Sequence, residues 1–361
     1  MFGWSSLLSI LLAWMLSVGP VSSKTVDFGE LQQEKNSGSL PSLLDNKERL
    51  WSGKAKQLHL ETGLFSDDLL VVSATSKKLF VSTGGPIDLL SGSISKRLPG
   101  RIVNLDLKTS SGSTEVAHVA VTLVTGNTLK TKIFDLTKTK KDNLTLTQVF
   151  RTNWALVRNV EDSFYRQEFD PQSGWVDEIV KIDVSPSSGP LQRTLRIPKT
   201  SRLDSLSHID DNRWVFLEGN GHLVLVVDGE RTAVIEGNFG RSSRTPTVGN
   251  GRSKQFDPDR FLRLAPVYLK KDHLLAVVNN PSPGRGIMNI FRAGETHSSI
   301  ELFELSNDSL KKIGSIGPQD GRVLDVDVSD ANPNQLLWIQ QLDDKTVSLE
   351  MIDFRSVDTP R

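Results

Sequence analysis

From about residue 50 onward, apolar and polar residues alternate with a period of two rather than 3.6. The clearest case is HVAVTLVTGNTLKTKIFDL at 118–136, where alternation runs to Val124, the residues TGN turn the chain, and alternation resumes to Phe134. Gly and Asn tolerate the positive φ that a tight hairpin turn requires. The stretch 213–236 holds two further turn signals, GNG and DGE, and so predicts three consecutive strands. The pattern predicts an all-β protein.

One phrase occurs twice, as GRIVNLDLKT from Gly100 and as GRVLDVDVSD from Gly321. Each copy predicts a short strand that ends in a polar turn and is followed by an intensely apolar strand. In this interpretation Asp106 and Asp327 close tight turns through side-chain-to-backbone hydrogen bonds. Weaker copies of the unit recur along the chain. Their apolar second strands are expected to begin near residues 69, 119, 179, 214, 274 and 336.

A single sheet built from one such unit cannot bury both of its faces, but neighbours stacked around a ring can. A recurring unit of short strands joined in sequence is typical of a propeller, and the spacing suits four-stranded blades with loop insertions. We therefore expect a β-propeller of six or seven blades, each a four-stranded antiparallel sheet, across residues 51–356.

The first 50 residues differ from the rest of the chain. SLLSILLAWMLSVG is almost unbroken in its apolarity and is followed by Pro20, with small Val21 and Ser23 at the positions that precede a cleavage point. This order predicts a signal peptide over 1–23 and an exported protein, periplasmic or at the cell surface. The alternative is an uncleaved anchor. Residues 24–50 are polar and turn-rich, which predicts a poorly ordered lead-in.

Composition excludes several classes of chemistry. The 361 residues contain no cysteine, so disulfides, thiolate metal sites and cysteine catalysis are ruled out. Lys+Arg and Asp+Glu are equal at 43 each, so no overall positive field favours a nucleic-acid partner. No segment after the leader has 18 apolar residues in a row, so no later transmembrane segment is predicted.

The order of segments across 212–330 carries a resemblance to a known family. LVLVVDGE, GNFGRSSRTP, RFLRLAPVYLKKDHLLAVVNN, HSSIELFELSNDSLKKIGSIG and GRVLDVDV follow one another there. The cadence resembles the FG-GAP or VCBS-type repeat of integrin-like β-propellers, in the divergent form of exported bacterial proteins. The resemblance implies a propeller fold over roughly residues 60–355.

Intact repeats of that family hold calcium in an Asp-x-Asp-x-Asp-Gly loop, and this chain departs from the pattern. In the loop from Asp327 the third residue is Ser329 and the fifth is Ala331, which removes the carboxylates that a hard cation needs. We therefore expect no metal site and no cofactor. If calcium were held, Asp327 and Asp330 would be the best-placed ligands.

No assembled catalytic motif is present: the sequence has no GxSxG elbow and no HExxH, so no catalytic residue is assigned. The most unusual surface segments are basic. The candidate binding residues in them are Arg241, Arg244, Arg252, Lys254, Arg260, Arg285 and Arg292. Such side chains suit an acidic glycan, a phosphate or an acidic protein. The alternative is that these are connecting loops kept soluble by their charge.

Two functions follow as hypotheses. The first is a non-catalytic exported propeller that serves as a binding or scaffold module for a protein or glycan, including as a subunit of an envelope complex. The second is a hydrolase or lyase acting on polysaccharide, with its site at the central funnel, where propellers also host active sites. Convergence of acids and histidines at the channel would favour the enzyme, and an apolar channel would favour the scaffold.

Overall fold

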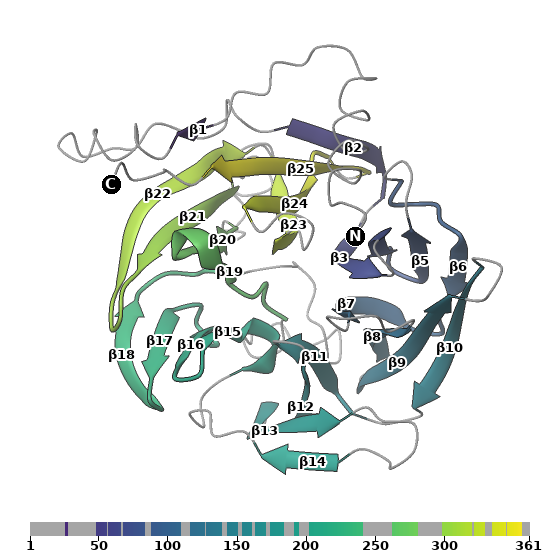
Figure 1. The fold of residues 1–361 in the computed structure, drawn as a ribbon, viewed down its shortest axis with the longest axis horizontal. Coiled ribbons are helices and arrows are strands. Elements are labelled where there is room, and N and C mark those ends of the chain that lie inside the picture. Colours follow the sequence, from purple (N-terminus) through teal and green to yellow (C-terminus); the bar gives the residue numbers. More distant parts are fainter. Residues whose placement is uncertain are drawn as a thin grey trace, which may run out of the picture.

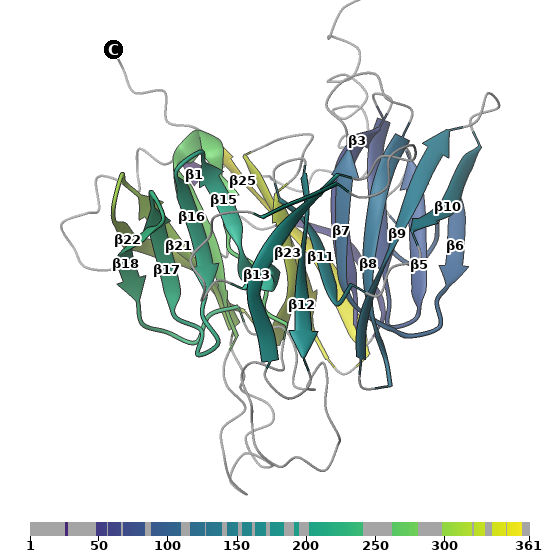
Figure 2. The ribbon, with the colours of Figure 1, turned by 90° about the horizontal axis from the view of Figure 1, so that it is seen from below.

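Six four-stranded sheets stand side by side in a ring around a central axis (Figure 1). A computed structural model describes residues 26–27 and most of 48–355, leaving out 241–261, 281–297 and several shorter gaps. Neighbouring strands of each four-stranded sheet are antiparallel, and Figure 2 shows the strands running roughly along the ring axis. The protein is a six-bladed β-propeller, which confirms the prediction of six or seven four-stranded blades.

Each blade uses strands that follow one another in the chain, and the first strand of each blade lies innermost. Blade 1 contains β3 (His59–Phe65), β4 (Asp68–Ala74), β5 (Lys78–Thr83) and β6 (Ile94–Arg97). Blade 2 contains β7 (Arg101–Thr109), β8 (Val116–Thr125), β9 (Thr128–Lys138) and β10 (Leu144–Phe150). Blade 3 contains β11 (Leu156–Val160), β12 (Ser163–Asp170), β13 (Gly174–Asp183) and β14 (Leu191–Thr194).

The remaining blades follow the same plan. Blade 4 contains β15 (Ser207–Asp210), β16 (Arg213–Leu217), β17 (Leu223–Val227) and β18 (Glu230–Ile235). Blade 5 contains β19 (Val267–Leu269), β20 (Leu274–Asn279), β21 (Ser298–Leu305) and β22 (Leu310–Gln319). Blade 6 contains β23 (Arg322–Val328), β24 (Gln335–Gln341) and β25 (Thr346–Arg355). Two short 3₁₀ helices, η3 (Leu203–Ser205) and η5 (Lys270–Asp272), lie at inner positions.

The ring is closed by strands from the two ends of the chain. The outer strand of blade 6 is β2 (Glu48–Lys54), which pairs antiparallel with β25. A two-residue strand, β1 (Val26–Asp27), pairs parallel with the end of β25. β1 and the start of β2 belong to the segment 24–50. Opening the ring at this blade requires breaking the β2–β25 ladder, so the pairing stabilises the closed form.

The second strand of a blade is apolar at almost every position because both of its faces are buried. In β20, Leu274, Ala276 and Val278 pack into the cluster shared with blade 6. The intervening Leu275 and Val277 pack into the cluster shared with blade 4. Each of the six junctions has a cluster of this kind. A strand buried on both faces reads as a continuous apolar run, and this is the signal that locates the blades in the sequence.

Five of the six predicted second strands begin where expected, at β4, β8, β16, β20 and β24. The third prediction, near residue 179, is wrong, because that position lies in β13, the third strand of blade 3. The second strand is β12, whose sequence SFYRQEFD carries several polar residues. Gln167 of β12 is nevertheless buried, because its side chain accepts the backbone N–H of Leu203 at 2.8 Å.

The glycines that open the repeated phrase are required by close packing. Gly321 has φ of 84°, and a Cβ added to it would lie 1.8 Å from the carbonyl oxygen of Gln341. A Cβ on Gly100 would lie 2.7 Å from the carbonyl oxygen of Val124. In both blades the innermost strand begins next to the last residues of the second strand, and only glycine fits there.

No helix among the described residues has the length and apolar character that crossing a bilayer requires.

Candidate functional site

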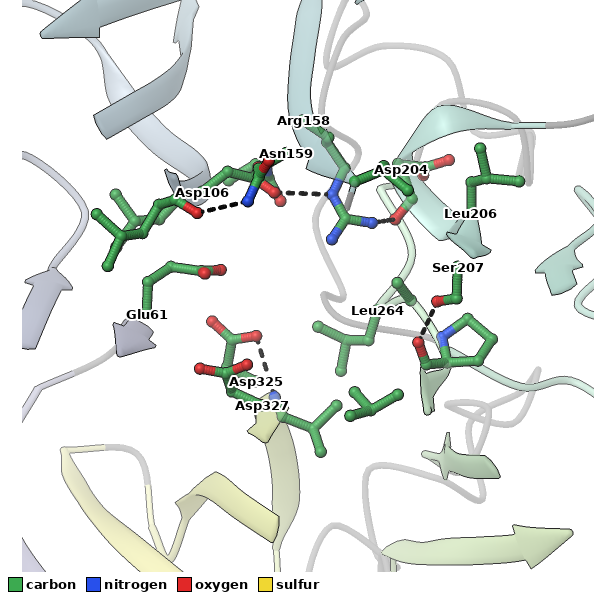
Figure 3. Close-up of a pocket in the computed structure, with 18 of the residues that line it drawn as sticks. Glu61, Asp106, Arg158, Asn159, Asp204, Leu206, Ser207, Leu264, Asp325 and Asp327 are labelled. Atoms are coloured by element: carbon green, nitrogen blue, oxygen red, sulfur yellow. Dashed lines mark hydrogen bonds and ion pairs between the residues drawn. The ribbon is translucent and has the colours of Figure 1, made fainter. Parts of the chain in front are cut away.

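The innermost strands of all six blades surround a cavity of about 640 Å³ on the ring axis (Figure 3). Four of its carboxylates gather on one side, apart from Asp204 at the entry to blade 4. Glu61 comes from β3, Asp106 from β7, and Asp325 and Asp327 from β23, so three neighbouring blades supply them. The acidic residues predicted only as parts of turns therefore converge at the channel.

The other side of the cavity comes from blades 4 and 5 and is mixed in character. Apolar Leu206, Leu264, Pro266 and Val267 lie there together with polar residues that include His208 and Lys270. Arg158 of β11 lies between the two sides, next to Asp106 (Figure 3). The cavity is thus asymmetric, with four carboxylates on one wall and the apolar residues on the facing wall.

Both copies of the repeated sequence contribute residues to the wall of this cavity. Asn104 and Asp325 occupy the same position of the phrase, as do Asp106 and Asp327, and all four line the cavity. The prediction that Asp106 and Asp327 close turns is wrong, because both lie within strands β7 and β23. The innermost strand of a blade has one edge toward the channel, so polar residues recur there at matching positions.

Most polar groups of the wall join one blade to the next. At the junction of blades 6 and 1, Asp325 Oδ2 accepts the backbone N–H of Leu60 at 3.1 Å. Asp327 Oδ2 accepts the backbone N–H of Thr62 at 3.3 Å and its hydroxyl at 3.2 Å. Between blades 1 and 2, Gln57 Nε2 donates to the carbonyl oxygen of Ile102 at 3.1 Å.

The links continue around the ring through blade 3. Arg158 Nε donates to Asp106 Oδ1 at 3.1 Å, and Asn159 Nδ2 donates to the carbonyl oxygen of Leu107 at 2.8 Å, which joins blades 2 and 3. Arg158 also donates to the carbonyl oxygens of Leu203 and Asp204, at 3.5 and 3.2 Å, and so reaches the entry to blade 4.

The last two junctions are joined in the same way. Asp204 Oδ2 accepts the backbone N–H of Arg263 at 2.7 Å, which joins the entries to blades 4 and 5. Asn280, fully buried after β20, donates to the carbonyl oxygen of Val323 at 2.8 Å and accepts its N–H at 3.1 Å, which joins blades 5 and 6. Every blade junction therefore carries a side-chain-to-backbone hydrogen bond near the channel.

Glu61 is different from the other carboxylates of the wall. Its carboxyl group forms no hydrogen bond or ion pair with another described residue. Burial raises the pKa of Glu61 well above its ordinary value, and the negative charges of Asp327, Asp106 and Asp325 raise it further, while Arg158 opposes them. Burial also raises the pKa of Asp106 to about 6, against the lowering effect of Arg158 and Asn104.

The basic residues predicted to bind a partner lie outside the described residues. These are Arg241, Arg244, Arg252, Lys254, Arg260, Arg285 and Arg292, and the same holds for Asp330. Asp327 lies in the cavity wall. Within the part of the chain that the structure describes, no group of three or more His, Asp or Glu side chains is arranged to hold a metal ion.

The sequence interpretation missed Glu61 and Arg158. Each sits in the short first strand of a blade, in HLETGLF and LVRNV, where the neighbouring positions are largely apolar. A charged residue inside the first strand of a repeating unit is a signal for a channel position. The signal becomes visible only when the strands have been assigned to blades, and the start of blade 3 was misplaced.

Comparisons with known proteins show no family for this chain. No family model matches the chain, and no curated protein matches it by sequence. Among solved structures, 307 chains match. One, a chain from the crystal structure of the mitotic checkpoint complex, is 10% identical with a TM-score of 0.42, and the match covers 82% of this chain and 76% of that one. A likeness at this level carries no functional argument.

Proposed function

We propose that the protein is a non-catalytic binding or scaffold module, exported to the periplasm or the cell surface and built from divergent FG-GAP or VCBS-type repeats. The observation that carries the proposal is the set of hydrogen bonds at all six blade junctions. They engage three of the four carboxylates on the acidic wall in holding the ring together. A rigid ring of this kind holds the ends of its blades in fixed positions, which suits a docking role.

The partner in this proposal is a protein or a glycan. The basic segments that contain Arg241, Arg252 and Arg292 remain the candidate contact residues, because clustered guanidinium groups bind carboxylates and phosphates. Support for export comes from the leader over 1–23 and from the absence of cysteine, which leaves the chain indifferent to an oxidising compartment.

A second candidate is a polysaccharide hydrolase or lyase with its site in the channel. The observation that favours it is the convergence of acids at the channel, where Glu61, whose raised pKa suits a general acid, faces the carboxylates of Asp327 and Asp106. It ranks second because Asp106 is ion-paired with Arg158 and Asp327 accepts two hydrogen bonds from Thr62. Both carboxylates therefore have a structural role in joining neighbouring blades.

An activity screen separates the two candidates. Neutral and acidic polysaccharides are incubated with the wild-type chain, with Glu61→Gln and with Glu304→Gln, an exposed glutamate on blade 5 that serves as the matched control. The proposal expects no release of reducing ends or unsaturated sugars by any of the three. Product released by the wild type and by Glu304→Gln but not by Glu61→Gln would overturn it and establish the enzyme.

Export is tested separately by sequencing the amino terminus of the protein from fractionated cells. Cleavage after Ser23 yields a chain that begins at Lys24 in the exported fraction. Recovery of the chain with residues 1–23 intact in the cytoplasmic fraction would refute export, while leaving the binding role to be judged by the activity screen.

A further inference from the structure

Two groups on the acidic side of the cavity are hydrogen-bond acceptors without a described donor, the Glu61 carboxyl and Asn159 Oδ1. Glu61 has no hydrogen-bond partner among the described residues. Asn159 directs Nδ2 to the carbonyl of Leu107, while its Oδ1 is buried without a described partner. Arg158, the cation that acts on Glu61, already donates to Asp106 and to two backbone carbonyls. An acceptor without a donor gains from a hydrogen bond to a ligand, so this side of the cavity suits a ligand that donates hydrogen bonds and carries positive charge.

The volume of the cavity and the residues opposite the carboxylates indicate which class of ligand fits. At about 640 Å³ the cavity is far larger than the space of a single water molecule, about 30 Å³, and so is much larger than a bare ion needs. Leu264, Pro266 and Val267 present hydrocarbon opposite the carboxylates. Most of the lining is polar, with this apolar strip on one side, so the cavity suits an organic ligand that carries a charged group on a short hydrocarbon stem.

We propose that the central cavity binds an organic cation, a primary ammonium or guanidinium group on an aliphatic stem. The charged group lies at Glu61 among Asp106, Asp325 and Asp327, and the stem lies against Leu264 and the residues that follow it. The cation comes either from a free amine or from a lysine or arginine side chain of a partner. The inference rests on the proposed binding role and adds to the basic segments a second contact site, at the central cavity.

Binding of this kind is linked to protons. The groups that act on Glu61 are Asp325 and Asp327 of β23, Asp106 of β7 and Arg158 of β11. Because the pKa of Glu61 and that of Asp106 are raised by burial, a bound cation favours their deprotonated forms and releases protons. Affinity for the cation therefore rises with pH, and the binding enthalpy depends on the buffer that takes up the protons.

Titration calorimetry on the full chain tests the proposal. The probes are n-butylammonium, n-butylguanidinium and the blocked tripeptide acetyl-Gly-Lys-Gly-amide, with 1-butanol as the uncharged control. Replacing Glu61 by Gln removes a charge-assisted contact and is expected to weaken binding of the charged probes about tenfold or more. Glu304→Gln is expected to leave it unchanged. Thermal unfolding of both variants checks that each is folded.

A second measurement needs no variant. Wild-type binding of n-butylammonium in two buffers of different ionisation enthalpy is expected to show proton release. A tripeptide that binds at least tenfold tighter than the free amines identifies a partner side chain as the source, and equal or weaker binding identifies a free amine. The inference is overturned if no charged probe binds, if 1-butanol binds equally well, or if Glu61→Gln binds as the wild type does. Such a result would refute the cation site without refuting the proposed function, because the polysaccharide screen tests that function separately.

Discussion

The carboxylate of Asp325 accepts a hydrogen bond from the backbone N–H of Leu60 at 3.1 Å, across the junction between the last blade and the first. On the outside of the ring, β2 from the N-terminal part of the chain pairs with β25 from the C-terminal part, and the chain runs from β2 into blade 1. Closure therefore has two parts, a strand ladder at the rim and carboxylates at the channel. The carboxylates of the acidic wall therefore help to close the ring, in addition to forming a candidate site.

Gly321→Ala is expected to destabilise the protein by more than about 3 kcal/mol, because the new Cβ would meet the carbonyl oxygen of Gln341 and the backbone would be strained. Gly229 has the same φ of 84° but open space around it, so Gly229→Ala reports the cost of the backbone alone, about 1 kcal/mol. Urea denaturation measures both. Equal losses in the two variants would contradict the steric explanation.

Asn280→Ala is expected to lower the free energy of unfolding by about 2–4 kcal/mol, because it leaves the N–H and the C=O of Val323 without their partner in a buried place. The control is Asn307→Ala, an exposed asparagine between β21 and β22, for which a change within about 0.5 kcal/mol is expected. Chemical denaturation of the two variants provides the comparison. A loss at Asn280 no larger than at Asn307 would show that the junction does not depend on this side chain.

The rim closure predicts coupling between Arg49 of β2 and Glu350 of β25. Arg49 Nε donates to Glu350 Oε1 at 2.8 Å, and the Glu350 side chain is only 1% exposed. Removing the half-exposed Arg49 leaves a buried carboxylate without its cation, so Arg49→Ala is expected to cost about 2 kcal/mol. A double-mutant cycle with Glu350→Gln is expected to give a coupling of about 1 kcal/mol or more. Additive losses would refute the coupling.

The raised pKa values of Glu61 and Asp106 predict how stability varies with pH. Both groups hold protons in the native state at pH values where the unfolded chain has lost them, so their contribution is fully present below about pH 4. The contribution of Asp106 is lost as pH rises through about 6, and the contribution of Glu61 is lost as pH rises through its own raised pKa.

Glu61→Gln isolates one of these contributions. The variant is expected to gain stability relative to the wild type as pH rises from about 4 to about 8, because the amide carries no charge to be repelled. Urea denaturation across this range measures the difference, and Glu304→Gln serves as the control. A difference that stays constant with pH would show that Glu61 ionises as an ordinary exposed glutamate does.

The positions of five of the six blades could be predicted because the second strand of a blade is buried on both faces. Runs such as LLAVVN of β20 are apolar at adjacent positions because each face meets a different blade, and this signal is local. Blade 3 was misplaced because β12 carries a buried glutamine that serves a backbone group thirty-six positions away in the sequence. The local pattern does not distinguish such a residue from an exposed one.

The sequence by itself determined the all-β class, the repeating unit, the approximate blade number and the exclusion of cysteine chemistry, because alternation, turn residues and composition are properties of neighbouring positions. Only the tertiary structure decided that Glu61, Asp106, Asp325 and Asp327 share one cavity. Ring closure brings the first and last blades together, and the charges of the three aspartates then raise the pKa of Glu61 across distances that no sequence spacing encodes.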